Sequence, residues 1–222
     1  MTALEQIAGI AHDPGGTPAG VVVLSHGAGG SRESPMLIGI CEEWAARGWL
    51  AIRYNLPYRR LRPKGPPPGS AASDRAGIAE AVEVARTLTG GPVVAGGHSY
   101  GGRLTSEVVA GGERVAALTL FSYPLHPPGK PGRLRTGRSA QPGRLRTEHF
   151  TSISVPAVFT HGSSDPFGSI AELEVAAALI AAPTEIVEVP GAGHDLGSKV
   201  PSKVTDVSVA SVDAALRHIG HC

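Results

Sequence analysis

Three side chains in this sequence could together carry out acyl transfer: Ser99, Asp165 and His194. A serine hydroxyl becomes a strong nucleophile when an imidazole takes its proton, and a carboxylate can hold that imidazole in the required tautomer. Ser99 lies within GHSYG, residues 97–101, which fits the pattern G-x-S-x-G. This pattern is typical of a nucleophilic serine on a sharp turn between a strand and a helix. We therefore predict that Ser99 is the nucleophile.

The glycines around Ser99 have a steric explanation. On such a turn the residues two positions before and after the serine must be small, because larger side chains would collide. The turn places the hydroxyl at a helix N-terminus, where the helix dipole and free N–H groups favour developing negative charge. The context agrees with the pattern, because a strand-like run, 93–99, precedes the turn and a helix-like segment, 100–110, follows it.

The two partners of the serine follow later strand-like runs. Asp165 comes after the run 155–162, and His194 ends the strand and loop 184–194. In open α/β sheets, functional groups lie beyond the carboxyl ends of the strands. We therefore expect three loops to bring Ser99, Asp165 and His194 together, with His194 as general base and Asp165 as its orienting acid.

Other acids and histidines fit these roles less well. Asp195 adjoins His194, and the side chains of chain neighbours diverge. His161 precedes the acid, and His98 belongs to the turn, where we expect a structural role. The remaining candidates have no partner pattern or lie in the C-terminal tail: His12, His126, His149, His218 and His221.

A second glycine-rich segment, HGAGG at 26–30, directly follows the first strong strand. A loop at this position supplies one donor of an oxyanion hole, and the residue after the nucleophile supplies the other. We assign these donors to the backbone N–H groups of Ala28 and Tyr100.

The elements that must position these residues alternate along the chain. Strand-like runs occupy 21–27, 49–55, 93–99, 115–124, 155–162 and 184–194. Helical patterns occupy 34–48, 74–90, 100–110, 170–182 and 204–220. The first 20 residues add an edge strand or wrap the surface. This alternation, with continuously apolar strands, predicts a mostly parallel sheet covered by helices on both faces.

The chain also resembles a known superfamily. The order HGAGG, GHSYGG, HGSSDPFG and GAGHDL is similar to that of the α/β hydrolases. The segments YNLPYR, FSYPLHPPGKP and LRTEH resemble a small branch near the dienelactone hydrolases that includes testis-expressed and chromatin-complex (NSL-type) members. The resemblance implies an α/β-hydrolase fold of six or seven strands with a minimal cap or none. The chain reads as one domain, 1–222. Its variable basic loop at 125–150 carries an eleven-residue duplication, in which PGRLRT occurs at 131–136 and again at 142–147.

Composition limits the other possibilities. No apolar run approaches the roughly 18 residues of a membrane-spanning helix, and the first residues lack the charge and apolar pattern of a secretory signal. We expect a cytoplasmic protein without a membrane or nucleic-acid partner, since the net charge is +1. Cys41 and Cys222 are too few for a cysteine-rich zinc site, and a disulfide between them has no support. The triad chemistry needs no metal or cofactor.

The basic residues are unevenly distributed. Eleven of the 20 lysines and arginines fall within 53–64 and 130–146, in loops that follow strands. A basic rim around the site would concentrate anionic substrates. The hypothesis assigns substrate contacts to Arg53, Arg59 and Arg60.

These observations favour a serine hydrolase acting on small soluble esters or lactones, as a monomer or a dimer. The segment 120–154 shows no amphipathic helices of the kind that cover a lipase site. Two alternatives remain open: an acyl thioesterase, and a catalytically weak scaffold whose arginine-rich loops bind an acidic partner.

Overall fold

The computed structural model describes residues 2–67, 69–130 and 146–219. Its strands are β1 (Gly9–His12), β2 (Val21–Ser25), β3 (Leu50–Tyr54), β4 (Val93–His98), β5 (Ala117–Phe121), β6 (Ala157–Gly162) and β7 (Thr184–Val189). They form one sheet in the order β1-β3-β2-β4-β5-β6-β7. β1 runs antiparallel to β3, and the other neighbouring strands in this part of the chain pair in parallel.

The six predicted strands are confirmed, and the N-terminal segment supplies a seventh at the edge. It begins with the short helix α1 (Ala3–Gln6), capped by the Thr2 side chain, and continues into β1. The central strands β2 and β5 are buried at every position, as continuous apolar runs predict for parallel strands covered on both sides.

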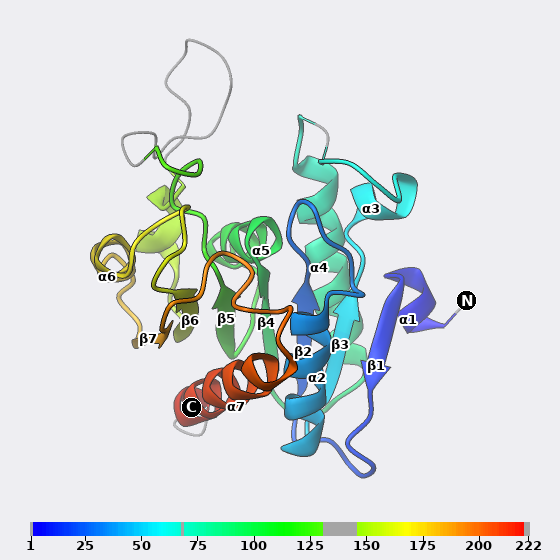
Figure 1. Cartoon of the computed structure of the whole chain (residues 1–222). Helices are drawn as coiled ribbons and strands as arrows, with labels where there is room; N and C mark the ends of the chain where they lie inside the picture. The colour runs from blue at the N-terminus through cyan, green and yellow to red at the C-terminus, as the bar shows by residue number, and fades with distance from the viewer. Residues whose placement is uncertain (1, 68, 131–145, 220–222) are drawn as a thin grey trace.

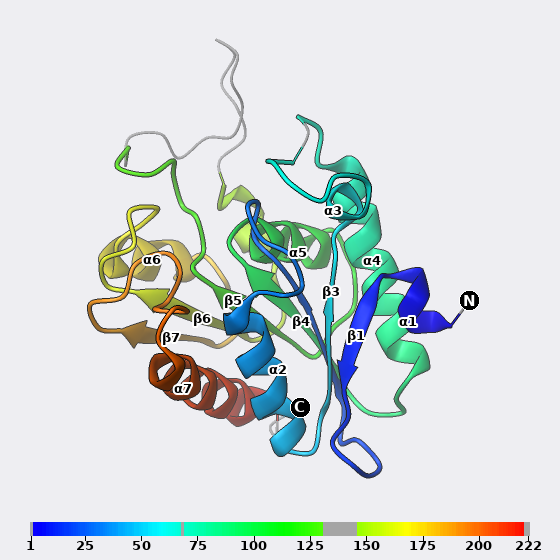
Figure 2. The same cartoon turned by 45° about the vertical axis from the view of Figure 1, so that its right-hand side comes forward.

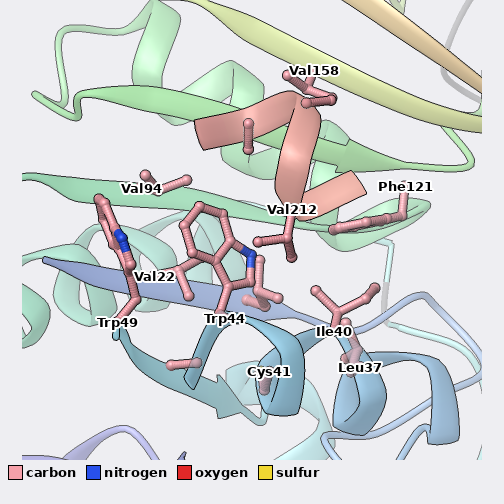
Figure 3. Close-up of a cluster of buried hydrophobic side chains, with 14 of the residues drawn as sticks. Val22, Leu37, Ile40, Cys41, Trp44, Trp49, Val94, Phe121, Val158 and Val212 are labelled. Carbon is pink, nitrogen blue, oxygen red and sulfur yellow. The ribbon is translucent and has the colours of Figure 1, made fainter. Parts of the chain in front are cut away.

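Two layers of helices cover the sheet (Figures 1 and 2). On one face lie α2 (Pro35–Ala46) and α7 (Pro201–Ile219), which pack against each other. On the other lie α4 (Ala72–Thr87), α5 (Tyr100–Ala110) and α6 (Ile170–Ala177). Figure 3 shows the core between the sheet and the first pair, where the indole of Trp44 lies between Val22 of β2 and Val212 of α7.

Helix boundaries follow local signals with small shifts. Pro35 is the first residue of α2, and Gly48, with φ of +80°, follows its C-cap. Ser34 is the N-cap residue of α2 and makes no side-chain capping hydrogen bond. The predicted helix 170–182 ends at Ala177, because the following amides bond three residues back in tighter turns.

Two further short helices lie in segments predicted as loops. They are α3 (Pro57–Leu61), which starts at a proline, and the 3₁₀ helix η1 (Glu148–Ser152). Most of the duplicated segment, 131–145, and Cys222 lie outside the described residues. The Cys41 thiol is buried, and burial raises its pKa to about 12.

Within the described residues, every helix is too short or too polar to cross a membrane.

Candidate active site

Ser99 occupies the turn between β4 and α5, as its sequence pattern predicts. Its backbone has φ of +51° and ψ of −113°, a conformation that is strained for a residue with a side chain. The Ser99 amide donates to the carbonyl of Phe121 in β5 (2.8 Å), and the Ser99 carbonyl accepts from the Arg103 amide in α5 (2.9 Å). The neighbouring strand and the helix thus hold the strained turn from both sides.

The glycines flanking Ser99 are required by close approach of the chain. A Cβ atom at Gly101 would lie 2.4 Å from the Ser25 hydroxyl and 2.5 Å from the His26 carbonyl. A Cβ atom at Gly97 would lie 2.4 Å from the same hydroxyl. The end of β2 therefore passes directly beneath the turn, which explains why the sequence carries glycine at both positions.

Asp165, His194 and Ser99 form a continuous chain of hydrogen bonds. The Nδ1 atom of His194 lies 2.8 Å and 3.0 Å from the two carboxylate oxygens of Asp165. Its Nε2 atom lies 2.8 Å from the Ser99 hydroxyl oxygen. With the proton on Nδ1 facing the carboxylate, Nε2 is free to accept the hydroxyl proton. The structure thus brings together the three residues that the sequence pattern predicted as partners.

The surroundings of Asp165 fix its carboxylate. Asp165 is buried, and its Oδ1 atom accepts a hydrogen bond from the Phe167 amide at 2.8 Å. The Phe167 ring stacks on the His194 imidazole, with ring centres 4.0 Å apart. Asp165 and the imidazole are therefore both held by the turn that follows β6.

His98 joins the serine turn to the histidine loop. Its Nε2 atom lies 2.8 Å from the His194 carbonyl oxygen. Burial lowers the pKa of His98 to about 4, so the ring is neutral at pH 7 and donates this hydrogen bond. This contact agrees with the structural role expected for His98. His161 is also buried and bonds to the Gly168 carbonyl (2.7 Å) rather than to the serine.

The glycine-rich segment after β2 forms a tight turn beside Ser99. The Gly30 amide donates to the Gly27 carbonyl at 3.0 Å. Ala28 lies in the wall of the pocket that contains Ser99. Tyr100 is the first residue of α5, where backbone N–H groups have no partner within the helix. Both residues assigned as oxyanion donors thus lie next to the serine in space or in sequence.

The pocket at Ser99 has a volume of about 400 Å³ and opens between the carboxyl ends of the strands. Apolar walls come from Met36, Leu37 and Phe167. Asp195 is the charged residue of its lining, which includes no lysine or arginine from the described part of the chain. The pocket suits a compact uncharged group.

The predicted substrate contacts of three arginines need correction, because their guanidinium groups are occupied elsewhere. Arg53 pairs with the Glu33 carboxylate at 2.8 Å and bonds to His12. Arg60 bonds to the carbonyls of Gln6 and Asn55.

Arg59 is buried and bonds to four backbone carbonyls: those of Ala28, Gly30, Arg62 and Gly65. None of the three arginines lies in the pocket lining, since each folds back onto the loops around β3 and α3. Arg133, Arg135, Arg138 and Arg144 lie outside the described residues.

The sequence interpretation overlooked three residues near the site. Phe167 follows Asp165 by two positions, and an aspartate that caps the amide two residues on is a recognisable turn signal. Tyr58 and Asp74 lie far from the triad in sequence, and only the fold brings them to the glycine-rich turn. The motif YNLPYR, which contains Tyr58, was the available signal.

Comparisons with known proteins agree with this architecture. Residues 18–219 match a family described as alpha/beta hydrolase domain. A dienelactone hydrolase from Anabaena variabilis is 21% identical with a TM-score of 0.71, covering 96% of this chain and 90% of that chain. Est1E from Butyrivibrio proteoclasticus, solved with ferulic acid, is 16% identical with a TM-score of 0.73, covering 96% and 95%.

An alpha-beta serine hydrolase homologue from Coxiella burnetii is also similar, with 16% identity and a TM-score of 0.65 over 93% of this chain and 90% of that chain. At these identities the structural likeness concerns the fold. The family match covers most of the chain, and the seven-stranded sheet agrees with it. The chain therefore belongs to the alpha/beta hydrolase domain family.

Proposed function

We propose that this protein is a serine hydrolase that cleaves small carboxylic esters or lactones through an acyl-enzyme. The observation that carries the proposal is the hydrogen-bonded chain Ser99–His194–Asp165 at the wall of an open pocket. A buried carboxylate, a correctly oriented imidazole and a serine in a strained turn together supply an activated nucleophile.

The reaction follows from these positions. His194 takes the hydroxyl proton as Ser99 oxygen bonds to the acyl carbon, and the backbone N–H groups of Ala28 and Tyr100 receive the oxyanion. The bond to the leaving alcohol breaks, and His194 gives it the proton. Water then adds to the acyl-enzyme by the same route, releasing the acid and free Ser99. Asp165 keeps the imidazole tautomer throughout and stabilises the imidazolium.

The pocket limits the substrate class. Its volume of about 400 Å³ and its apolar wall favour compact acyl groups. The sequence suggested a preference for anions, but the described lining carries Asp195 and no basic side chain, which favours neutral substrates. The similarity to a dienelactone hydrolase and to Est1E, which was solved with ferulic acid, supports lactones and esters as the first substrate classes to test.

The first test uses the Ser99→Ala variant with a fluorophosphonate probe and p-nitrophenyl acetate. The wild-type protein is expected to be labelled at Ser99 and to hydrolyse the ester. The variant is expected to lose labelling and at least about 10⁴-fold in kcat/KM, because the nucleophile is gone. Its urea-unfolding midpoint should stay close to that of the wild type. Turnover by the variant, or an unlabelled wild type, would contradict the proposal.

The same assay separates the substrate classes. Acetyl, butyryl and octanoyl esters, simple lactones, an acyl thioester and a carboxylated ester are compared by kcat/KM. We expect the short neutral esters or lactones to be best and the carboxylated ester to gain nothing at low salt. A strong salt-dependent preference for the carboxylated ester would restore the basic-rim hypothesis, and preference for the thioester would redirect the assignment.

A further inference from the structure

A buried carboxylate that the proposed mechanism does not use lies beside the serine turn. Asp74, near the start of α4, is 1% exposed. One of its carboxylate oxygens accepts a hydrogen bond from the Tyr58 amide at 3.0 Å. The other accepts from the Tyr100 hydroxyl at 2.8 Å. Burying a carboxylate is costly unless it is hydrogen-bonded, so these two bonds fix its position. Asp74 thereby connects α3 to the residue that follows Ser99.

The Tyr58 side chain continues this connection to the glycine-rich turn. Its hydroxyl donates one hydrogen bond that is shared between the Ala28 carbonyl at 2.7 Å and the Gly27 carbonyl at 3.2 Å. The Arg59 guanidinium donates to the Ala28 carbonyl at 3.2 Å and to the Gly30 carbonyl at 2.7 Å. The α3 segment therefore binds the carbonyls of three residues of the turn: Gly27, Ala28 and Gly30.

The direction of these carbonyls sets the direction of the amides. In a trans peptide, the carbonyl of one residue and the N–H of the next point to opposite sides, and the described residues contain no cis peptide. The Gly27 carbonyl points towards three groups that bond to it: the Gly30 amide, the Tyr58 hydroxyl and the His26 ring, whose Nδ1 atom lies 2.8 Å away. The N–H group of Ala28 therefore points the other way.

His26 is locked in the state that this contact requires. Burial lowers its pKa to about 4, so the ring is neutral at pH 7. Its Nε2 atom accepts a hydrogen bond from the Leu56 amide at 3.2 Å, which leaves the proton on Nδ1 to be donated to Gly27. The Gly27 carbonyl thus accepts hydrogen bonds from His26, from Tyr58 and from the Gly30 amide.

We infer that Tyr58, held in place by Asp74, is a positioning residue for the oxyanion hole. The inference rests on the proposed function and adds the device that aligns its two donors. Through Tyr58, Asp74 holds the peptide groups on both sides of Ala28, the first of which carries the Ala28 N–H. Through the Tyr100 hydroxyl it anchors the residue that carries the second amide. Donors fixed before reaction stabilise the developing charge without reorganisation.

The test compares two tyrosine variants that each lose one buried hydroxyl. Tyr58→Phe removes the contact to the glycine-rich turn. Tyr123→Phe is the control, because its buried hydroxyl donates to the Arg146 carbonyl at 2.7 Å in another part of the molecule. We measure kcat, KM, the Ki of a trifluoromethyl ketone, whose adduct places an oxyanion in the site, and the urea-unfolding midpoint.

Tyr58→Phe is expected to lower kcat about 10- to 100-fold and to change KM less than twofold, as for other residues that orient a reacting group through a neighbour. The trifluoromethyl ketone Ki should rise by the same factor as kcat/KM falls. Tyr123→Phe should retain kcat within twofold, while its urea-unfolding midpoint falls by about as much as that of Tyr58→Phe. Wild-type kcat and Ki in Tyr58→Phe, or equal losses in both variants, would overturn the inference.

A double-mutant cycle tests the link to Asp74. Asp74→Asn retains the size of the side chain, and we expect it to lower kcat with little change in KM. If Asp74 acts through Tyr58, the fold-loss in kcat of the double variant should be much smaller than the product of the fold-losses of the two single variants. Full multiplicativity would overturn the link. A wild type without turnover or fluorophosphonate labelling would instead remove the proposed function itself, so the two failures are distinguishable.

Discussion

At the scale of single residues, the site depends on which acid faces the imidazole. Asp165 and Asp195 are both close to His194 in the fold, and Asp195 is adjacent in sequence. The structure places both Asp165 oxygens within 3.0 Å of Nδ1, whereas the Asp195 carboxylate accepts a hydrogen bond from the Gly197 amide. The choice made from chain order and strand ends therefore agrees with the observed contacts.

This difference gives a matched prediction. Asp165→Asn should lower kcat/KM by about 10⁴-fold, because an amide can hold the imidazole in the wrong tautomer. Asp195→Asn should keep kcat/KM within a few-fold, since its side chain does not contact the ring nitrogen. Both are measured with p-nitrophenyl acetate at pH 7.5. Similar losses in the two variants would mean that charge near His194, and not its orientation, is what matters.

At the scale of elements, the serine turn at the end of β4 is determined by how closely the end of β2 approaches it. The glycines could be recognised in the sequence, but their contact partner, the end of β2, is 70 residues or more away along the chain. Parallel pairing of β2 with β4 places Ser25 beside Gly97. The turn is therefore a product of the sheet as much as of its own pentapeptide.

Gly101→Ala tests this close approach. The added methyl group would meet the Ser25 hydroxyl and the His26 carbonyl, and one of these partners is backbone. We expect the free energy of unfolding to fall by about 1–3 kcal/mol and kcat/KM to fall about 100-fold, because the serine is displaced. Gly16→Ala is the control, since no heavy atom lies within 4 Å of its added methyl group. Equal behaviour of the two variants in urea unfolding and ester hydrolysis would contradict the steric argument.

At the scale of the whole molecule, burial couples stability to pH. The pKa of His26 is lowered from 6.5 to about 4, so the folded state keeps the ring neutral while the unfolded chain protonates it below about pH 6.5. The stabilisation is complete above pH 6.5 and is lost as the pH falls from there towards 4. The glycine-rich turn and the segment at Leu56, which His26 joins, are therefore held together best at neutral pH.

We expect the free energy of unfolding to fall by about 2 kcal/mol between pH 7.5 and pH 5 through His26 alone. Urea unfolding at both pH values measures the change. Other groups titrate in the same range, so the His26→Asn variant serves as the reference. Between pH 7.5 and pH 5, the unfolding free energy of this variant should fall by about 2 kcal/mol less than that of the wild type, even if the variant is less stable at both pH values. An unchanged pH dependence would show that His26 is not the titrating group.

The sequence by itself determined the parallel α/β architecture, the serine turn and the order of its partners. These depend on local signals: apolar runs that must be buried, glycines that permit a tight turn, and residues that follow strand ends. The N-terminal edge strand stayed open between two possibilities, because a four-residue run has too little periodicity to decide. The helix α3 was missed for the same reason.

Only the tertiary structure decided which groups the arginines and Tyr58 contact. Arg53, Arg59 and Arg60 were expected at the substrate, yet each long side chain finds carbonyl or carboxylate partners on a neighbouring loop. A guanidinium group can reach any of several partners, and its sequence neighbours do not say which. The contact of Tyr58 with Ala28 likewise spans 30 residues and forms because β2 and β3 lie side by side.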